Sequence, residues 1–146
     1  GKRMATTAGT AQRTEAKAYP MLCYRDPAAA IKWLVRAFGA EEHMRVTGED
    51  GRIVHAELRI GSGVVMLGSF GDDRLRVQPP RELSGLTGGV YIGTDGVDAL
   101  HDRAKAAGAE IVIPLHDTHY GSRDFGVLDP EGQLWCFGTY RPEIGG

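Results

Sequence analysis

The feature that most constrains the fold of this chain is an internal repeat with a spacing of 69 positions. Asp26 stands before one amphipathic segment and Asp95 before another, and aspartate is well suited to cap the start of a helix. The triplet Gly39-Ala40-Glu41 follows the first segment and Gly108-Ala109-Glu110 follows the second, where glycine favours the end of a helix. Matching starts and stops at a single spacing predict two copies of one structural module.

The first copy is predicted to run strand, helix, strand, strand, strand. Its helix begins at Asp26-Pro27 and ends before Gly39. Residues at helical spacing give it one apolar face, formed by Ile31, Leu34, Val35 and Phe38. Trp33 lies off this face, so we expect it to cover an edge or a partner subunit. The predicted strands span residues 19–25, 41–47, 52–60 and 64–70.

The second copy repeats this order and closes with a hairpin. Its helix follows Asp95, which we expect to be the N-cap, and ends at Gly108. One side of the helix carries Val97, Leu100, Ala104 and Ala107. The hairpin turns at Asp129-Pro130-Glu131-Gly132, where proline fixes one backbone angle and glycine accepts a positive φ. The predicted strands span residues 88–94, 110–115, 125–128 and 134–137, with a loop at 116–122.

The two modules are predicted to form a single domain, because 146 residues suit one compact core. A loosely held tail is expected at residues 1–18 and a polar linker, which contains Pro79-Pro80, at residues 71–87. The first module then occupies residues 19–70 and the second occupies residues 88–142.

Charge and composition exclude several classes of function. The formal net charge is −2 and no lysine or arginine run is interleaved with aromatic residues, so we expect no nucleic-acid partner. No segment approaches the roughly 18 consecutive apolar residues of a membrane helix, so we expect no membrane partner. Cys23 and Cys136 lie far apart in strand segments, which favours buried free thiols in a cytoplasmic protein over a disulfide.

Several motifs give this repeat a family resemblance. They are the opening in which an aspartate-capped helix ends at Phe38-Gly39-Ala40, the run His55-Ala56-Glu57-Leu58 before a glycine-bounded turn, and Arg123 and Phe125 followed by Asp129-Pro130-Glu131-Gly132 and Trp135. With the duplication, they resemble the glyoxalase/bleomycin-resistance/dioxygenase group of the vicinal oxygen chelate superfamily. The resemblance implies an α+β fold of two βαβββ modules, whose curled, half-open sheets surround a cavity that a homodimer usually completes.

The same resemblance implies a divalent metal, bound by His, Gln or Glu in the first and last strands of each module. In this chain those positions fall on Tyr19 and Met66 in the first module, and on Gly88 or Gly89 and Cys136 in the second. Glycine offers no side chain, methionine is a poor ligand for hard divalent ions, and a lone cysteine with a tyrosine does not complete a site. We therefore expect no metal and no cofactor.

Two groups of polar residues leave alternatives open. His55 and Glu57 share a strand face, and a two-residue turn at Gly61-Ser62 would place Glu57 across from Met66, inside the cavity. This pair either transfers protons, anchors a ligand or stabilises the rim of the cavity. The segment His116-Asp117-Thr118-His119 is expected to be a solvated loop, since it lacks the fixed spacing of paired metal ligands on a helix.

Arg123 enters the last hairpin at the expected mouth of the cavity. It either binds a ligand carboxylate or forms an ion pair with Asp124 or Asp129. Tyrosines that alternate onto the concave faces suit a flat organic ligand, although aromatic core packing explains them as well. The predicted ligand-binding residues are Tyr19, His55, Glu57, Met66, Tyr91, Arg123 and Cys136.

The leading functional hypothesis is a metal-independent, homodimeric protein of the bleomycin-resistance type that sequesters a small organic ligand. The alternative is a metal-dependent glyoxalase-like lyase, isomerase or dioxygenase with a displaced metal site, or an enzyme that uses His55 and Glu57 as acid and base. A structural or regulatory dimer without a ligand is the third possibility.

Overall fold

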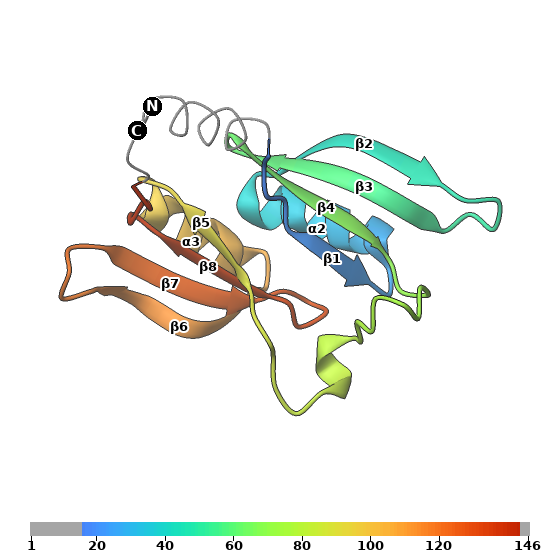
Figure 1. Cartoon of the computed structure of the whole chain (residues 1–146). Coiled ribbons are helices and arrows are strands. Elements are labelled where there is room, and N and C mark those ends of the chain that lie inside the picture. The colour runs from blue at the N-terminus through green and yellow to red at the C-terminus, as the bar shows by residue number, and fades with distance from the viewer. Residues whose placement is uncertain (1–15, 144–146) are drawn as a thin grey trace, which may run out of the picture.

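The computed structural model describes residues 16–143, which form two four-stranded sheets and two α-helices (Figure 1). The first half of the chain contains β1 (Met21–Tyr24), α2 (Pro27–Phe38), β2 (Glu41–Thr47), β3 (Ile53–Ile60) and β4 (Gly63–Ser69). The second half contains β5 (Val90–Gly93), α3 (Val97–Ala106), β6 (Glu110–Asp117), β7 (Arg123–Leu128) and β8 (Leu134–Gly138). The predicted α+β class with two βαβββ units is confirmed.

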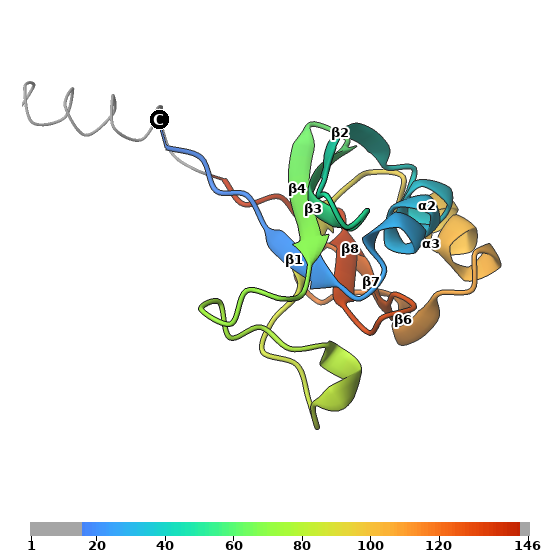
Figure 2. The same cartoon turned by 90° about the vertical axis from the view of Figure 1, so that its right-hand side faces the viewer.

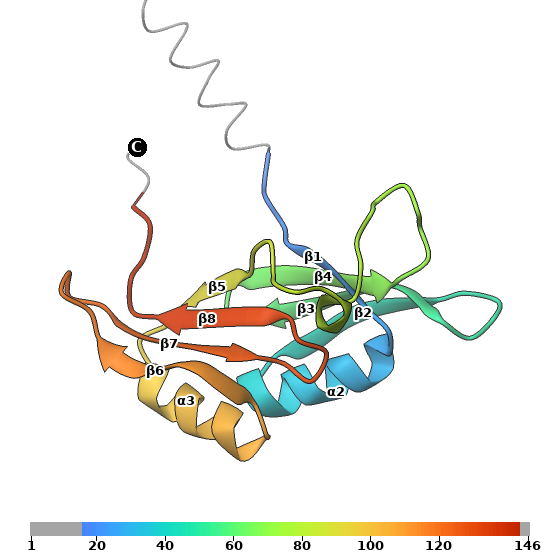
Figure 3. The same ribbon diagram turned by 90° about the horizontal axis from the view of Figure 1, so that it is seen from below.

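Both sheets have the same topology. The strand order is β1-β4-β3-β2 in the first sheet and β5-β8-β7-β6 in the second. In each sheet the first strand runs parallel to the last, and the other pairs are antiparallel. Helices α2 and α3 lie side by side on one side of the strands, so one face of each sheet is left without a helix (Figures 2 and 3).

The connection between β4 and β5 contains a short 3-10 turn, η1 (Pro80–Glu82), and lies below both sheets in Figure 1. Arg81 of this turn donates from Nε to the carbonyl of Pro130, 3.2 Å away, which ties the linker to the last hairpin. None of the helices within residues 16–143 is long and apolar enough to cross a membrane. Most of the predicted tail, residues 1–15, lies outside the part that the structure describes.

Helix α2 has the predicted ends but a wider buried surface than predicted. The carboxylate of Asp26 accepts a hydrogen bond from the backbone N–H of Ala29 at 3.0 Å, and Gly39 ends the helix with a φ of 72°. Val35, expected in the apolar face, is 37% exposed, whereas Trp33 is buried. Trp33 donates from Nε1 to the carbonyl of Ala107, 2.8 Å away, so it does not cover an outer edge. Its predicted position was wrong because α2 is buried on two sides, by its own sheet and by the second half of the chain.

The N-cap predicted for the second helix was also wrong. Gly96 holds that position without a side-chain hydrogen bond, and Asp95 instead contacts Arg141 at 3.3 Å. The connection from β5 to α3 is one residue longer than the connection from β1 to α2, so the carboxylate falls one residue too early. The spacing of 69 is kept at Gly39 and Gly108, so α3 starts one residue later within an unshifted repeat.

Two predicted strand features also differ. Strict alternation along the predicted strand at residues 52–60 puts Val54 on the buried face with Ala56, but Val54 is 56% exposed and Ile53 is buried in its place. Val46 pairs with His55 and Thr47 pairs with Ile53, so Val54 is skipped in a bulge. Strand β6 extends to Asp117, which places His116 and Asp117 in a strand rather than in the predicted loop.

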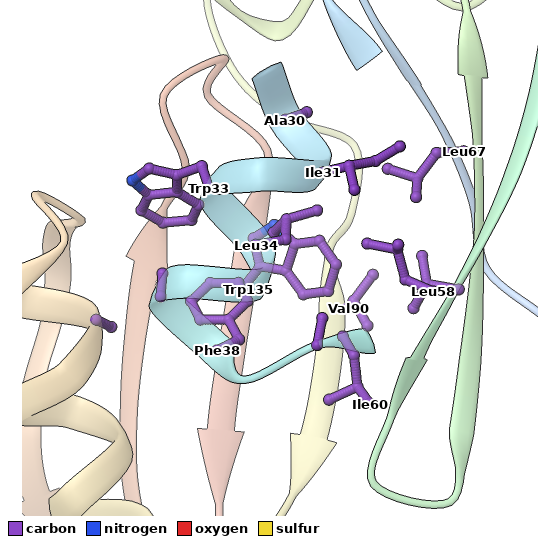
Figure 4. Packing of buried hydrophobic residues seen from close by; sticks show 14 of the residues in the cluster. Ala30, Ile31, Trp33, Leu34, Phe38, Leu58, Ile60, Leu67, Val90 and Trp135 are labelled. Carbon is purple, nitrogen blue, oxygen red and sulfur yellow. The ribbon is translucent and has the colours of Figure 1, made fainter. Parts of the chain in front are cut away.

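The core joins the two halves of the chain (Figure 4). The ring of Phe38, at the end of α2, lies 5.2 Å from that of Trp135 and 4.8 Å from that of Phe137, both in β8. The buried carboxylate of Asp129 accepts hydrogen bonds from Tyr24 Oη at 2.6 Å and from Trp135 Nε1 at 3.0 Å. The last hairpin is therefore part of the contact between the two halves.

Candidate ligand-binding site

The candidate site lies on the sheet faces that no helix covers. Along β3, Ala56, Leu58 and Ile60 are buried beneath α2, so His55, Glu57 and Arg59 point to the open face. Along β7, Phe125 and Val127 are buried, so Asp124 and Gly126 lie on the open face. Several large apolar side chains of these faces or of their rims are exposed: Met44, Val46, Tyr91, Ile113 and Tyr140.

The open face of the first sheet brings together four of the predicted ligand-binding residues. Glu57 and Met66 are cross-strand partners, as predicted, and His55 Nε2 lies 2.8 Å from Glu57 Oε2. Tyr19, Glu57 and Met66 line a hollow of about 300 Å³ together with His43, Arg59 and Val64. His55 is joined to this hollow through its contact with Glu57.

The open face of the second sheet holds a larger hollow, of about 860 Å³. Tyr91 and Cys136 line it and are neighbours across β5 and β8, as the prediction of a shared site requires. Most of its wall was not in the predicted ligand-binding set: Ile113, His116, Asp117, Thr118, His119, Tyr120, Asp124 and Tyr140. One sequence signal could have placed Asp124 in the site. If Phe125 points into the core, alternation along the strand puts its neighbour Asp124 on the opposite, open face.

Two glycines lie beneath side chains that line this second hollow. A Cβ atom at Gly138 would overlap the Asp124 carboxylate and lie 2.6 Å from Tyr91 Oη, so both side chains extend over a bare strand. A Cβ atom at Gly126 would lie 3.0 Å from Ile113 Cδ1. The absence of side chains at these two positions lets Asp124, Tyr91 and Ile113 fold down onto the sheet and leaves space above them.

Asp124 supplies the negative charge of the second hollow. Ser122, which is buried, donates from Oγ to Asp124 Oδ1, and Tyr120 Oη lies 3.4 Å from Oδ2. Burial first, and then the Asp124 charge, raise the pKa of the Tyr91 hydroxyl and the pKa of the Cys136 thiol. Both groups therefore remain protonated near neutral pH, which makes Cys136 a poor nucleophile.

Arg123 lies away from both hollows. Its Nε donates to Asp98 Oδ1 at 2.7 Å, and its Nη1 donates to Asp117 Oδ1 at 3.0 Å. These two carboxylates raise the pKa of the guanidinium. The predicted ion-pair partners, Asp124 and Asp129, were wrong, because Arg123 shares the face of β7 that carries the buried Phe125. Its contacts connect the start of α3 to the end of β6.

The strand positions that bind metal in many relatives do not suit a hard divalent ion here. In the observed register Met66 lies beside Met21 and Cys136 lies beside Tyr91, which together offer two thioethers, a protonated thiol and a phenol. Within residues 16–143, no group of three or more His, Cys, Asp or Glu side chains is placed to hold an ion. Both cysteines in this range are free thiols.

Within one chain, the predicted ligand-binding residues are therefore divided. Four belong to the first hollow, two belong to the second, and Arg123 belongs to neither. The two hollows share no lining residue.

The fold and these sites can be compared with known proteins. An uncharacterized protein of Mycobacterium tuberculosis is 38% identical over 130 residues, which cover 86% of this chain and 75% of that protein. The crystal structure of TioX from Micromonospora sp. ML1 shares 35% identity with a TM-score of 0.67, and the match covers 89% of this chain and 100% of that chain.

A more distant structure shows the same fold. The fosfomycin resistance protein FosX from Listeria monocytogenes is 19% identical with a TM-score of 0.60, over 84% of this chain and 91% of that chain. The family model that describes the Glyoxalase/Bleomycin resistance protein/Dioxygenase superfamily matches residues 18–137. This chain belongs to that superfamily.

Proposed function

We propose that the protein binds a small organic molecule on the open faces of its sheets, without a metal at the superfamily's usual position and without chemical turnover. The observation that carries this proposal is the second hollow, with its tyrosine rim and its volume of about 860 Å³. Ligand sites commonly have volumes of about 300–1,000 Å³ and few polar groups among apolar walls. The poor donor set at the metal positions favours binding over metal chemistry.

A second copy of the chain would complete the cavity. Met44, Val46 and Ile113 expose apolar surface on the edge strands of the two sheets, where water is an unfavourable neighbour. A homodimer in which the first hollow of one copy faces the second hollow of the other would enclose a ligand between them. His55 and Glu57 would then lie opposite the tyrosine rim and orient its polar groups.

A neutral fluorescent probe tests the binding step. N-phenyl-1-naphthylamine brightens when it leaves water, and we expect saturable brightening with the wild-type chain. Cys136→Met is the matched variant, because Met66 already occupies the equivalent position in the first sheet. The longer side chain should project into the hollow where a ligand would lie and weaken binding about tenfold, with an unchanged unfolding midpoint. Binding that survives this substitution would place the probe elsewhere and refute the proposal.

The dimer is tested separately by sedimentation equilibrium. We expect the mass of two chains at micromolar concentration. Val46→Glu would place a charge on the exposed edge strand β2 and should yield monomers that retain their circular dichroism spectrum. A wild-type chain that remains monomeric at high concentration contradicts the shared cavity.

One observation favours a second candidate function, an enzyme with a displaced metal site. His55 and Glu57 lie 2.8 Å apart on the open face, and a second copy could supply further donors. Elemental analysis of the purified protein decides between the two. A stoichiometric divalent metal that is lost in His55→Gln would replace the binding proposal with a catalytic one.

A further inference from the structure

The second hollow contains a carboxylate that lacks a cationic partner within residues 16–143. The other carboxylate that lines this hollow, Asp117, is already paired with Arg123 at 3.0 Å. Asp124 receives only hydroxyl donors, from Ser122 on one oxygen and from Tyr120, at 3.4 Å, on the other. Its second oxygen therefore retains capacity for a stronger donor.

Aromatic rings surround this carboxylate. The rings of Tyr120 and Tyr140 meet edge to face with centroids 6.3 Å apart, and both side chains are more than half exposed. The ring of His119 packs against Tyr120 at 5.2 Å. On the other side, Tyr91 Oη donates to the carbonyl of Tyr140 at 2.9 Å, which fixes its ring beside the hollow. Ring faces attract cations, so these side chains reinforce the Asp124 charge.

The arrangement is fixed before any ligand arrives. Ser122 Oγ donates to Asp124 and accepts from the backbone N–H of Tyr140 at 3.1 Å, so one buried hydroxyl positions both the carboxylate and the rim. The bare strand at Gly138 holds the carboxylate against the sheet floor. A site that is already ordered loses little conformational entropy on binding.

We propose that the second hollow selects organic ligands that carry a positively charged amine, with Asp124 as the counter-ion and Tyr91, Tyr120 and Tyr140 as the aromatic rim. This inference rests on the binding function proposed above and adds the charge of the ligand to it. A flat or apolar body would lie against Ile113 and the tyrosine rings, while the ammonium group would lie beside Asp124. Anionic ligands would be disfavoured, because Asp124 repels them and the lining residues include no lysine or arginine.

Three probes of nearly the same shape test the proposal: (2-naphthylmethyl)trimethylammonium, the neutral 2-neopentylnaphthalene, and 2-naphthylacetate. Their dissociation constants would be measured by NMR titration of the full chain at 0.15 M salt. We expect the cation to bind about tenfold more tightly than the neutral probe, and the anion to bind most weakly.

Asp124→Asn keeps the size of the side chain and an acceptor for Ser122, so it removes only the charge. We expect it to abolish the preference for the cation while leaving the affinity of the neutral probe within about twofold. Asp98→Asn is the matched control, because it changes the net charge equally but removes a carboxylate that lies outside the hollow and is already paired with Arg123. Its cation preference should remain, whereas Tyr120→Leu should reduce it about threefold.

The results separate this proposal from the one on which it rests. Equal binding of the cation and the neutral probe by the wild-type chain refutes charge selection but leaves ligand binding intact. A preference that survives Asp124→Asn also refutes it. Failure of all three probes to bind at millimolar concentration refutes both proposals.

Discussion

Replacing Asp129 with asparagine should destabilise the fold far more than an ordinary surface substitution. The Asp129 side chain is 2% exposed and accepts four hydrogen bonds. Oδ2 accepts from Tyr24 Oη and Trp135 Nε1, and Oδ1 accepts from the backbone N–H groups of Glu131 and Gln133, both at 3.0 Å. Asparagine can serve only one of these two groups of donors, because its other terminal atom is an N–H donor.

The expected cost follows from those contacts. Trp135 Nε1 would face another donor and lose its acceptor, which costs about 1–3 kcal/mol for a buried group. The remaining bonds would lose the assistance of the charge, about 0.5–1 kcal/mol each. The total is about 3 kcal/mol, or about a 10 °C decrease in Tm for a domain of this size.

Urea unfolding, followed by tryptophan fluorescence, measures this cost. Asp73→Asn is the control, since Asp73 is exposed and makes no side-chain hydrogen bond within residues 16–143. We expect the control to lie within about 0.5 kcal/mol of the wild type. A free-energy change below about 1 kcal/mol for Asp129→Asn would show that the polar centre of the core contributes little, and the account of the last hairpin would be wrong.

Three further predictions follow from single contacts. Burial first, and then Asp129, raise the pKa of Tyr24 well above its ordinary value of 10.0, so the folded state keeps a proton that the unfolded state releases. The stability contributed by the Tyr24 hydroxyl is therefore complete below about pH 10 and is lost as the pH rises beyond it. Tyr24→Phe should flatten the resulting decline of the urea unfolding midpoint between about pH 9 and 11. Trp33→Phe removes a donor from the contact between the two halves and should cost about 1–2 kcal/mol in the same assay. Gly39→Ala, at a φ of 72°, should cost about 1 kcal/mol, whereas Gly85→Ala, in open space, should cost almost nothing.

The fold was predictable because its strongest signals are local. Each of these signals depends on neighbours within a few residues: the cap at Asp26, the helix end at Gly39 and the alternation along β3. The repeat then predicted that the second half has the same order of elements as the first. The errors arose where distant segments meet. Trp33 is buried against the second half of the chain, where its indole donates to the carbonyl of Ala107, 74 positions away in sequence. No periodicity within α2 reveals this second buried side.

The candidate site was predicted only in part for the same reason. His55, Glu57 and Met66 were placed together because a two-residue turn fixes the register of their hairpin. The second hollow depends on the five-residue connection between β7 and β8 and on the irregular pairing of β6 near Pro114. Those irregularities decide which of Tyr120, Asp124 and Tyr140 converge, and they cannot be read from alternation alone.

The two halves place side chains of different size at equivalent positions of their open faces. Glu57 and Met66 are cross-strand partners in the first sheet, and Gly126 and Cys136 are the corresponding partners in the second. Cys136 lines the hollow of about 860 Å³, and the longer Glu57 and Met66 line the hollow of about 300 Å³. A duplicated module can therefore devote one copy to holding the body of a ligand and the other to presenting polar groups. The two reciprocal substitutions should therefore have different effects on probe binding. Cys136→Met should weaken it, because the change lies in the larger hollow. Met66→Cys should enlarge the smaller hollow and leave the main contact surface of the ligand in place.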